Sequence, residues 1–180
     1  IHSMKDDPAE QPDGLAIAAV PEREDARDGF ISEHFATFAD LPHGARLGTA
    51  SLRRQAQALA LRPDLQIEML RGNVDTRLKR LKDGDFDAIL LACSGLNRLG
   101  LSEVIRERLS LDDFLPAPGQ GALAIQTRAD DADADWTRVL NHDLTALAVA
   151  AERGAMAALE GSCRTAIGAH AHIEGDVLRL

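Results

Sequence analysis

The sequence has few aromatic residues and no long apolar run. It contains no tyrosine, one tryptophan and 3% aromatic residues in total, which argues against the aromatic platforms on which single-stranded nucleic acids stack. No stretch of about 18 apolar residues is present, so no membrane-spanning helix is predicted. No charged and then apolar segment opens the chain, as a signal peptide would. We therefore expect a cytosolic protein that binds neither a membrane nor a nucleic acid.

Cysteine and lysine are also scarce. The two cysteines, Cys93 and Cys163, lie far apart without CxxC spacing, so the sequence predicts neither a zinc or iron–sulfur site nor a disulfide framework. Only three lysines stand against 17 arginines, although the net charge is −9. Arginine binds carboxylates through two parallel hydrogen bonds. A genomic preference for arginine codons explains the same count, so the positions of the arginines have to decide.

Strands and helices alternate through the middle of the sequence. Strands are predicted at 46–50, 65–70 and 86–93, the last with Cys93 in the core, and helices begin at Ser51, Asn73 and Ser94. This β-α-β-α-β-α order is typical of a parallel sheet with helices on both faces. The middle of the chain is therefore predicted to be an α/β domain.

The flanking segments predict further elements. The apolar run at 15–20 indicates a buried strand, and a loop rich in proline and glycine at 115–121 leads to another strand. An alanine-rich helix is expected at 143–159, capped by Asn141 or Asp143, and strands are expected at 165–172 and 177–180.

Five arginines fall near the carboxyl ends of the predicted parallel strands: Arg53, Arg54, Arg71, Arg77 and Arg98. Ligands of such sheets bind at this edge, where helix N-termini also favour anions. The expected ligand carries several carboxylates or phosphates. A nucleotide is disfavoured, because the turns lack the GxxxxGK[ST] and GxGxxG patterns. A non-enzymatic anion-binding module of the periplasmic-binding type would fit these observations equally well.

Two further segments hold reactive residue types. Lys5 and Asp6 lie at a strand-to-loop junction, and Cys163 precedes an arginine that would favour its thiolate. Adjacent lysine and aspartate are most often a solvated pair, and a lone cysteine is most often structural. Spacing alone therefore leaves both segments open.

Taken together, five segments resemble the successive motifs of the porphobilinogen deaminase (hydroxymethylbilane synthase) family. They occur in the family's order and cover nearly the whole chain. The segments are His2-Ser3-Met4-Lys5-Asp6, Gly48-Thr49-Ala50-Ser51-Leu52-Arg53-Arg54, Leu70-Arg71-Gly72-Asn73-Val74-Asp75-Thr76-Arg77, Pro116-Ala117-Pro118-Gly119-Gln120-Gly121 and Glu160-Gly161-Ser162-Cys163.

The resemblance implies a protein of three domains, the first two similar to type II periplasmic binding proteins. Residues 1–22 and 122–142 would belong to domain 1, residues 23–121 would be the carboxylate-binding domain 2, and residues 143–180 would begin a small α+β domain 3 that attaches the cofactor. We accordingly expect the sequence to be a fragment that lacks the N-terminal part of domain 1 and the end of domain 3.

The resemblance also implies roles for individual residues. Asp6 matches the catalytic carboxylate, and Cys163 matches the cysteine that carries a dipyrromethane cofactor through a thioether. The remaining matches hold the acetate and propionate groups of cofactor and substrate: Ser3, Lys5, Thr49, Ser51, Arg53, Arg54, Arg71, Arg77 and Arg98, of which Arg71, Arg77 and Arg98 would also contact the substrate.

The implied reaction condenses four porphobilinogens, with loss of ammonia, into the linear tetrapyrrole hydroxymethylbilane. The full-length protein would be a monomer, whereas the fragment is expected to be inactive and prone to self-association through exposed apolar runs such as 15–20. One residue departs from the family pattern: Asp7 stands where the family more often has an apolar residue. Because neighbours in an extended segment point to opposite faces, Asp7 is expected to face solvent.

Overall fold

The structure is a computed structural model that describes residues 1–8, 11–131, 135–159 and 165–180. The chain divides into two compact units, of which unit 1 comprises residues 1–26 and 115–180 and unit 2 comprises residues 27–114. Unit 2 lies within the predicted second domain. The division of the remaining residues into two further domains stays a prediction.

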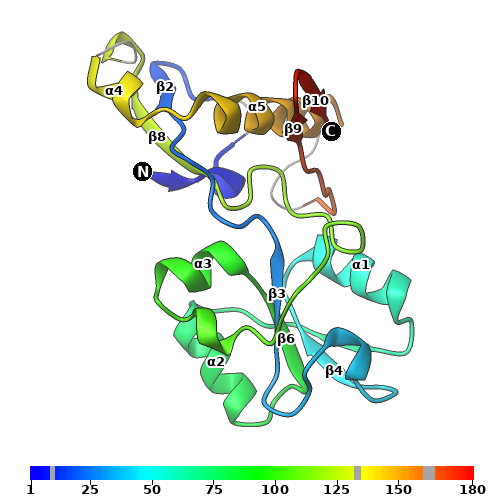
Figure 1. The fold of residues 1–180 in the computed structure, drawn as a ribbon. Helices are drawn as coiled ribbons and strands as arrows, with labels where there is room; N and C mark the ends of the chain where they lie inside the picture. The colour runs from blue at the N-terminus through cyan, green and yellow to red at the C-terminus, as the bar shows by residue number, and fades with distance from the viewer. Residues whose placement is uncertain (9–10, 132–134, 160–164) are drawn as a thin grey trace. The chain divides into compact units, whose positions relative to one another are not determined.

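Unit 2 contains a five-stranded sheet with helices on both faces (Figure 1). The strand order is β5-β4-β6-β3-β7. Its strands are β3 (Asp28–Ile31), β4 (Arg46–Gly48), β5 (Gln66–Glu68), β6 (Ala88–Ala92) and β7 (Glu107–Arg108). Its helices are α1 (Leu52–Leu61), α2 (Val74–Lys82) and α3 (Cys93–Arg98), with short 3-10 turns at η2 (Phe38–Asp40) and η3 (Ser102–Val104).

Side-chain caps begin the first two helices of unit 2, as the sequence predicts. The Ser51 hydroxyl accepts a hydrogen bond from the Arg54 amide at 3.4 Å, and the Asn73 side chain accepts one from the Thr76 amide at 2.8 Å. Each cap satisfies a backbone N–H that has no partner within the helix. The third helix begins one residue earlier than predicted, so Cys93 is a buried helical residue and not part of the strand.

The sheet is mixed, because one central strand runs against the others. Strand β4 is parallel to β5 and β6, whereas β3 is antiparallel to both β6 and β7. The sequence does not predict β3. Alternate residues of β3 and β6 face opposite sides of the sheet: Phe30 and Leu90 join the core under α1, while Ile31 and Ile89 join the core under α2 and α3.

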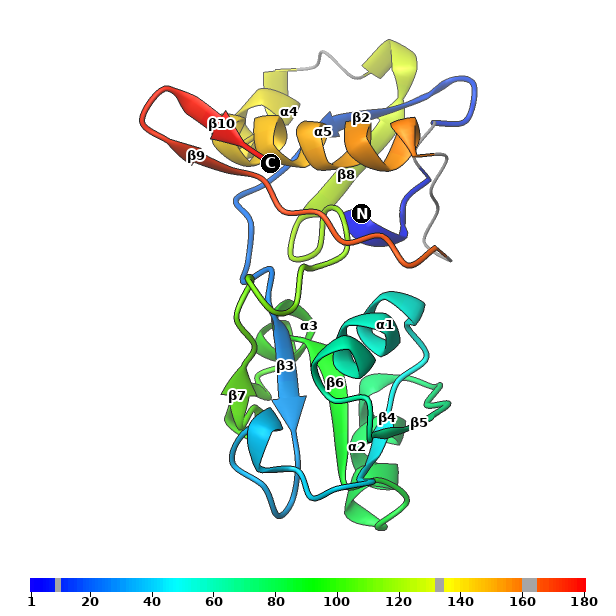
Figure 2. The same cartoon turned by 90° about the vertical axis from the view of Figure 1, so that its right-hand side faces the viewer.

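Unit 1 contains a three-stranded antiparallel sheet beside a long helix (Figure 2). The sheet order is β1-β8-β2, formed by β1 (His2–Ser3), β8 (Leu123–Arg128) and β2 (Leu15–Ala19). The other elements are η1 (Met4–Asp6), η4 (Ala129–Asp131), α4 (Asp135–Leu140), α5 (Asp143–Ala158) and the hairpin of β9 (His172–Glu174) with β10 (Val177–Arg179). Met4, Ala122, Ala124 and Val149 form its core.

Several predictions for unit 1 need correction. Helix α5 is capped by His142, whose ring nitrogen accepts from the Thr145 amide at 3.3 Å, and not by Asn141 or Asp143. The predicted strand at 165–172 is wrong except for its last residue, because residues 165–171 are not in a strand and β9 begins at His172. Helix α4 is an additional helix. The run at 15–20 is only partly buried.

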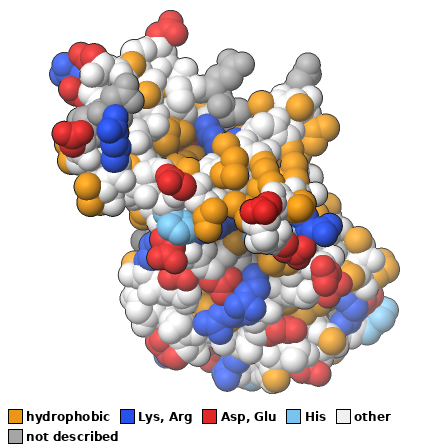
Figure 3. Space-filling model, turned by 45° about the horizontal axis from the view of Figure 1, so that its top comes forward, with side chains coloured by type: hydrophobic (Ala, Val, Ile, Leu, Met, Phe, Trp, Pro, Cys, Tyr) orange, Lys and Arg blue, Asp and Glu red, His pale blue; other side chains and the backbone are white. Residues whose placement is uncertain are grey.

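Apolar side chains are exposed on unit 1 among acidic and basic ones (Figure 3). On α4 and α5 they are Trp136, Val139, Leu140, Leu144 and Leu147. Self-association of the chain, expected through exposed apolar runs such as residues 15–20, stays a prediction. None of the helices within the described ranges is long and apolar enough to cross a membrane.

Candidate carboxylate-binding site

A buried aspartate organises the arginines at the carboxyl edge of the sheet in unit 2. Arg54 donates from Nε and Nη2 to Asp28 Oδ1 at 3.0 and 2.7 Å, and Arg53 Nη2 lies 2.8 Å from Asp28 Oδ2. Arg54 also donates to the Leu90 carbonyl at 3.2 Å. Asp28 is fully buried, and the two arginines are 4% and 8% exposed. The motif Arg53-Arg54 is therefore fixed by a charge partner inside the fold.

Sequence reasoning missed Asp28 because it missed β3. The antiparallel pairing places Asp28 opposite Ala92, the last residue of β6. The first residue of β3 is thus at the same edge as the last residues of the parallel strands. The available signal was an acidic residue followed by Gly29 and the short apolar pair Phe30-Ile31.

Positive charge remains at this edge after the Asp28 pairings. Burial lowers the pKa of Arg53, as does the repulsion from Arg54, against the opposing effect of Asp28. Burial also lowers the pKa of Arg77, and the nearby Arg54 charge adds to that effect. Arg54 thus repels both Arg53 and Arg77, while the single carboxylate of Asp28 is shared by Arg53 and Arg54. An anionic ligand would relieve this repulsion.

Arg71 comes from the loop that follows β5, and Arg77 comes from the helix α2 after that loop. Arg77 is half-buried, and its Nε donates to the Gly72 carbonyl at 2.8 Å. Arg71 is exposed. Within the described ranges, neither arginine forms an ion pair. Arg98, the last residue of α3, is exposed as well.

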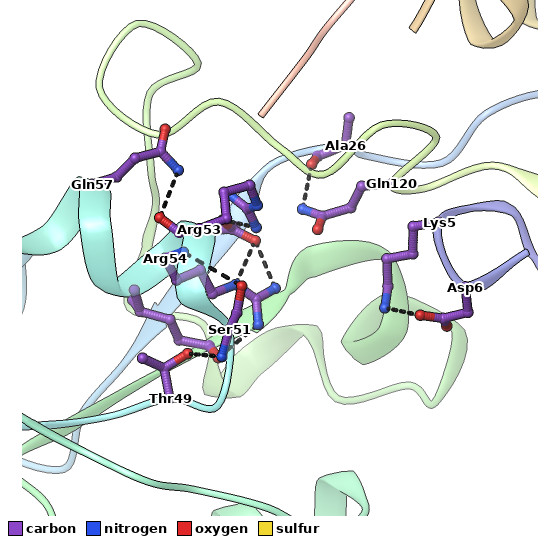
Figure 4. Close-up of polar contacts among 11 residues, drawn as sticks. Lys5, Asp6, Ala26, Thr49, Ser51, Arg53, Arg54, Gln57 and Gln120 are labelled. Atoms are coloured by element: carbon purple, nitrogen blue, oxygen red, sulfur yellow. Dashed lines mark hydrogen bonds and ion pairs between the residues drawn. The ribbon is translucent and has the colours of Figure 1, made fainter. Parts of the chain in front are cut away.

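Thr49 and Ser51 shape the turn between β4 and α1. The Thr49 hydroxyl accepts from the Ser51 amide at 3.1 Å (Figure 4). The Thr49 amide donates to the Glu68 carbonyl at 3.0 Å. The Ser51 hydroxyl is engaged as the cap of α1. These contacts hold the start of α1, and with it Arg53 and Arg54, at the end of β4.

The other predicted site residues, Ser3, Lys5 and Asp6, belong to unit 1. Ser3 ends β1 opposite Leu123, and the 3-10 turn η1 follows. Lys5 Nζ donates to Asp6 Oδ1 at 2.9 Å (Figure 4), and the Asp6 side chain is 63% exposed. An accessible carboxylate beside an ammonium group is able to accept a hydrogen bond or a proton from a ligand.

The prediction for Asp7 is wrong. Its side chain is 3% exposed and forms an ion pair with Arg153 of α5 at 3.2 Å. Gln11 Nε2 also donates to Asp7 Oδ2 at 2.6 Å. Asp6 and Asp7 do differ in exposure, but the turn directs Asp7 toward α5 and not toward solvent.

The Pro-Ala-Pro-Gly-Gln-Gly motif forms a tight loop in unit 1. Gly119 and Gly121 have φ values of +75° and +90°, and a Cβ at Gly119 would lie 2.6 Å from Met4 Cγ. Both positions therefore require glycine. Between them, Gln120 is buried and donates to the Ala26 carbonyl at 2.7 Å (Figure 4).

Buried Glu152 of α5 ties this loop to two distant segments. Its carboxylate accepts from the Gly119 amide at 2.6 Å, from the Ala171 amide at 2.7 Å, and from Arg23 at 2.7 and 3.0 Å. All of the carboxylate's hydrogen-bonding capacity is used inside the protein, so Glu152 has a structural role. Cys163, the predicted attachment residue, lies outside the described residues.

Comparison with known proteins gives a consistent result. Residues 1–135 match the family model described as porphobilinogen deaminase, dipyromethane cofactor binding domain. The porphobilinogen deaminase of Caulobacter sp. (strain K31) is 63% identical over 180 residues, which are 100% of this chain and 57% of that protein. The porphobilinogen deaminase of Nitratidesulfovibrio vulgaris (strain DP4) is 55% identical over 177 residues, which are 98% of this chain and 56% of that protein.

Solved structures with similar folds share little sequence with this chain. A putative methionine-binding lipoprotein from Bacillus subtilis has a TM-score of 0.48 at 17% identity, covering 71% of this chain and 60% of its own. A nutrient-binding protein from Burkholderia cenocepacia bound to methionine has a TM-score of 0.45 at 18% identity, covering 79% of this chain and 66% of its own.

Proposed function

The chain belongs to the porphobilinogen deaminase family, and we propose that it forms the catalytic and cofactor-binding part of a hydroxymethylbilane synthase. This transferase condenses four porphobilinogens, with loss of ammonia, into a linear tetrapyrrole. The chain spans just over half the length of the curated relatives it matches. The activity is therefore proposed for a full-length protein that contains these residues and acts in the cytoplasm.

The observation that carries the proposal is the incompletely neutralised arginine cluster of unit 2. Arg53 and Arg54 share the single carboxylate of Asp28, and the half-buried Arg77 and the exposed Arg71 each add a further guanidinium. The acetate and propionate groups of porphobilinogen and of dipyrromethane supply the missing negative charges. Each charge-assisted hydrogen bond to such a group contributes about 1.5–3 kcal/mol.

This donor set fits a bound dipyrromethane, which supplies the primer to which pyrrole units are added. Arg71 and Arg77 would hold its carboxylates, and Arg53 and Arg54 would add to the local positive potential. Thr49 and Ser51 would contribute through the backbone that they fix, and Ser3, Lys5 and Arg98 through their side chains. Cys163 would provide the covalent attachment.

Asp6 is the residue to which we assign the chemistry. Loss of ammonia from porphobilinogen leaves a cation spread over the pyrrole, and a carboxylate that accepts the pyrrole N–H stabilises this cation. At about 4 Å and an effective dielectric near 20, such a pair is worth roughly 4 kcal/mol before desolvation. That energy corresponds to about a thousandfold in rate if it acts only in the transition state. Asp6 would also accept the proton that the adduct loses.

The test uses a full-length chimera in which residues 1–180 replace the matching segment of the Caulobacter sp. relative. Its intact mass should include a dipyrromethane adduct that disappears in Cys163→Ser, and the unsubstituted chimera should produce hydroxymethylbilane. Asp6→Asn should retain the adduct and lose most turnover, since the amide neither offsets the positive charge nor accepts a proton. A chimera that binds porphobilinogen without adduct or turnover would support the non-enzymatic anion-binding module instead.

A further inference from the structure

One arginine of α5 holds the turn that carries Asp6. Arg153 Nη1 donates to the Met4 carbonyl at 3.5 Å and to the Asp7 carbonyl at 3.3 Å, and Nη2 donates to the Pro8 carbonyl. The same Nη2 donates to the Asp7 carboxylate at 3.2 Å. A single guanidinium thus contacts the backbone on both sides of Asp6.

The contacts of Arg153 lie in a largely buried environment. The side chains of Arg153 and Asp7 are 11% and 3% exposed. The turn is closed by the Asp7 amide, which donates to the Met4 carbonyl at 3.2 Å, and it is joined to the sheet by the Met4 amide, which donates to the Ala122 carbonyl at 3.0 Å. The planar guanidinium reaches several acceptors at once, which an ammonium group on a lysine stem does not reproduce.

Asp6 itself has little side-chain support. Within the described ranges, the Asp6 carboxylate has one hydrogen-bond partner, the neighbouring Lys5. The direction of this carboxylate therefore depends mainly on the backbone of η1, because no other element of the described chain holds it. The backbone of η1 is what Arg153 and Asp7 fix.

We propose that Arg153 and Asp7 form a clamp that positions the Asp6 carboxylate for catalysis. The inference rests on the proposed role of Asp6. Arg153 and Asp7 are positioning residues in this account, because both act through the turn and not on a ligand. Displacement of a reacting group by about 1 Å costs as much as a hundredfold in rate, so even a modest loosening of η1 should affect turnover.

The first test measures the turn in the 180-residue chain by amide hydrogen exchange. Arg153→Met should accelerate exchange at the Met4 and Asp7 amides by about tenfold or more, because their local opening no longer has to break the clamp. The amides of β9 and β10 should be unchanged. Arg179→Met is the matched control, since it removes the exposed ion pair with Glu174 in the same unit.

The second test measures turnover in the chimera. Arg153→Met and Asp7→Asn should each lower kcat by about tenfold or more, with KM for porphobilinogen changed less than about threefold. Arg153→Lys should recover only part of the loss, and Arg179→Met should have no effect. Dipyrromethane content, measured by mass, should be the same in all variants.

The two tests separate the clamp from the function on which it rests. An inactive unsubstituted chimera would refute the proposed function. Hydrogen exchange would still decide whether Arg153 fixes the turn. The clamp is overturned if the exchange rates of the Met4 and Asp7 amides in Arg153→Met equal those of the unsubstituted chain. It is overturned equally if the variants lose thermal stability but keep the full kcat of the folded enzyme, because the pair would then be structural only.

Discussion

Removal of the Asp28 carboxylate should destabilise unit 2 severely. Asp28→Ala leaves Arg53 and Arg54 inside the fold, where their side chains are 5% and 10% exposed, without the carboxylate that both contact. Loss of one partner from a buried ion pair costs about 3–5 kcal/mol, because the remaining charge stays unsolvated. For a domain of 60–100 residues, each kcal/mol lowers Tm by about 4–8 °C. The expected decrease in the midpoint of unit 2 is therefore about 12 °C or more.

The assay can assign the effect to one unit. Trp136, the only tryptophan of the sequence, is in α4 of unit 1, so its fluorescence reports the unfolding of unit 1. Far-UV circular dichroism reports both units. We expect Asp28→Ala to shift the part of the thermal transition that tryptophan fluorescence does not follow.

A matched control comes from an exposed pair in the same unit. Asp83, the residue that follows α2, pairs with Lys79 of that helix, and their side chains are 50% and 74% exposed. Solvent screens such an exposed pair, so it contributes little to stability. Asp83→Ala should therefore change the midpoint of unit 2 only slightly. If Asp28→Ala and Asp83→Ala had equal effects, the argument for uncompensated buried charge would be refuted.

Three further predictions concern pH, backbone conformation and charge geometry. Burial lowers the pKa of His170. The stabilising contribution of the neutral imidazole should therefore be fully present above a pH of about 6.5 and should decline as the pH falls below that value. His170→Gln should reduce this decline, as measured by Tm at a series of pH values on both sides of about 6.5. Gly121→Ala should lower the Tm of unit 1 far more than Gly14→Ala, because both have positive φ but only at Gly121 would a Cβ lie 2.3 Å from a carbonyl oxygen. In the chimera, Arg71→Ala should raise KM for porphobilinogen and Arg71→Lys should restore it only partly, since lysine lacks the two-pronged geometry; equal KM values for the lysine and arginine forms would contradict this assignment.

Local signals predict the helices of unit 2 well. Ser51 and Asn73 each precede a stretch with helical periodicity and cap it as expected. Such caps depend on residues three positions apart, so the sequence contains the whole interaction. The strand that precedes each of these helices is also found, although with fewer residues than predicted.

Long-range contacts account for what the sequence did not predict. Strand β3 is four residues long, and its place between β6 and β7 depends on pairing partners about 60–80 positions away in sequence. Asp28 could not be assigned to the arginine edge without that pairing. The burial of Asp7 likewise depends on Arg153, which is 146 positions away, and alternation along an extended segment does not reveal whether the opposite face meets solvent or another helix.

The division of the chain has a consequence for the order in which it folds. Unit 2 is continuous in sequence, whereas unit 1 is assembled from residues 1–26 and 115–180. During synthesis, residues 27–114 leave the ribosome as a set that holds all its own partners, and domains generally fold as such units. The strand β2 has to wait for β8, its only partner in the described sheet. We therefore expect unit 2 to fold while translation continues, before β2 has paired with β8.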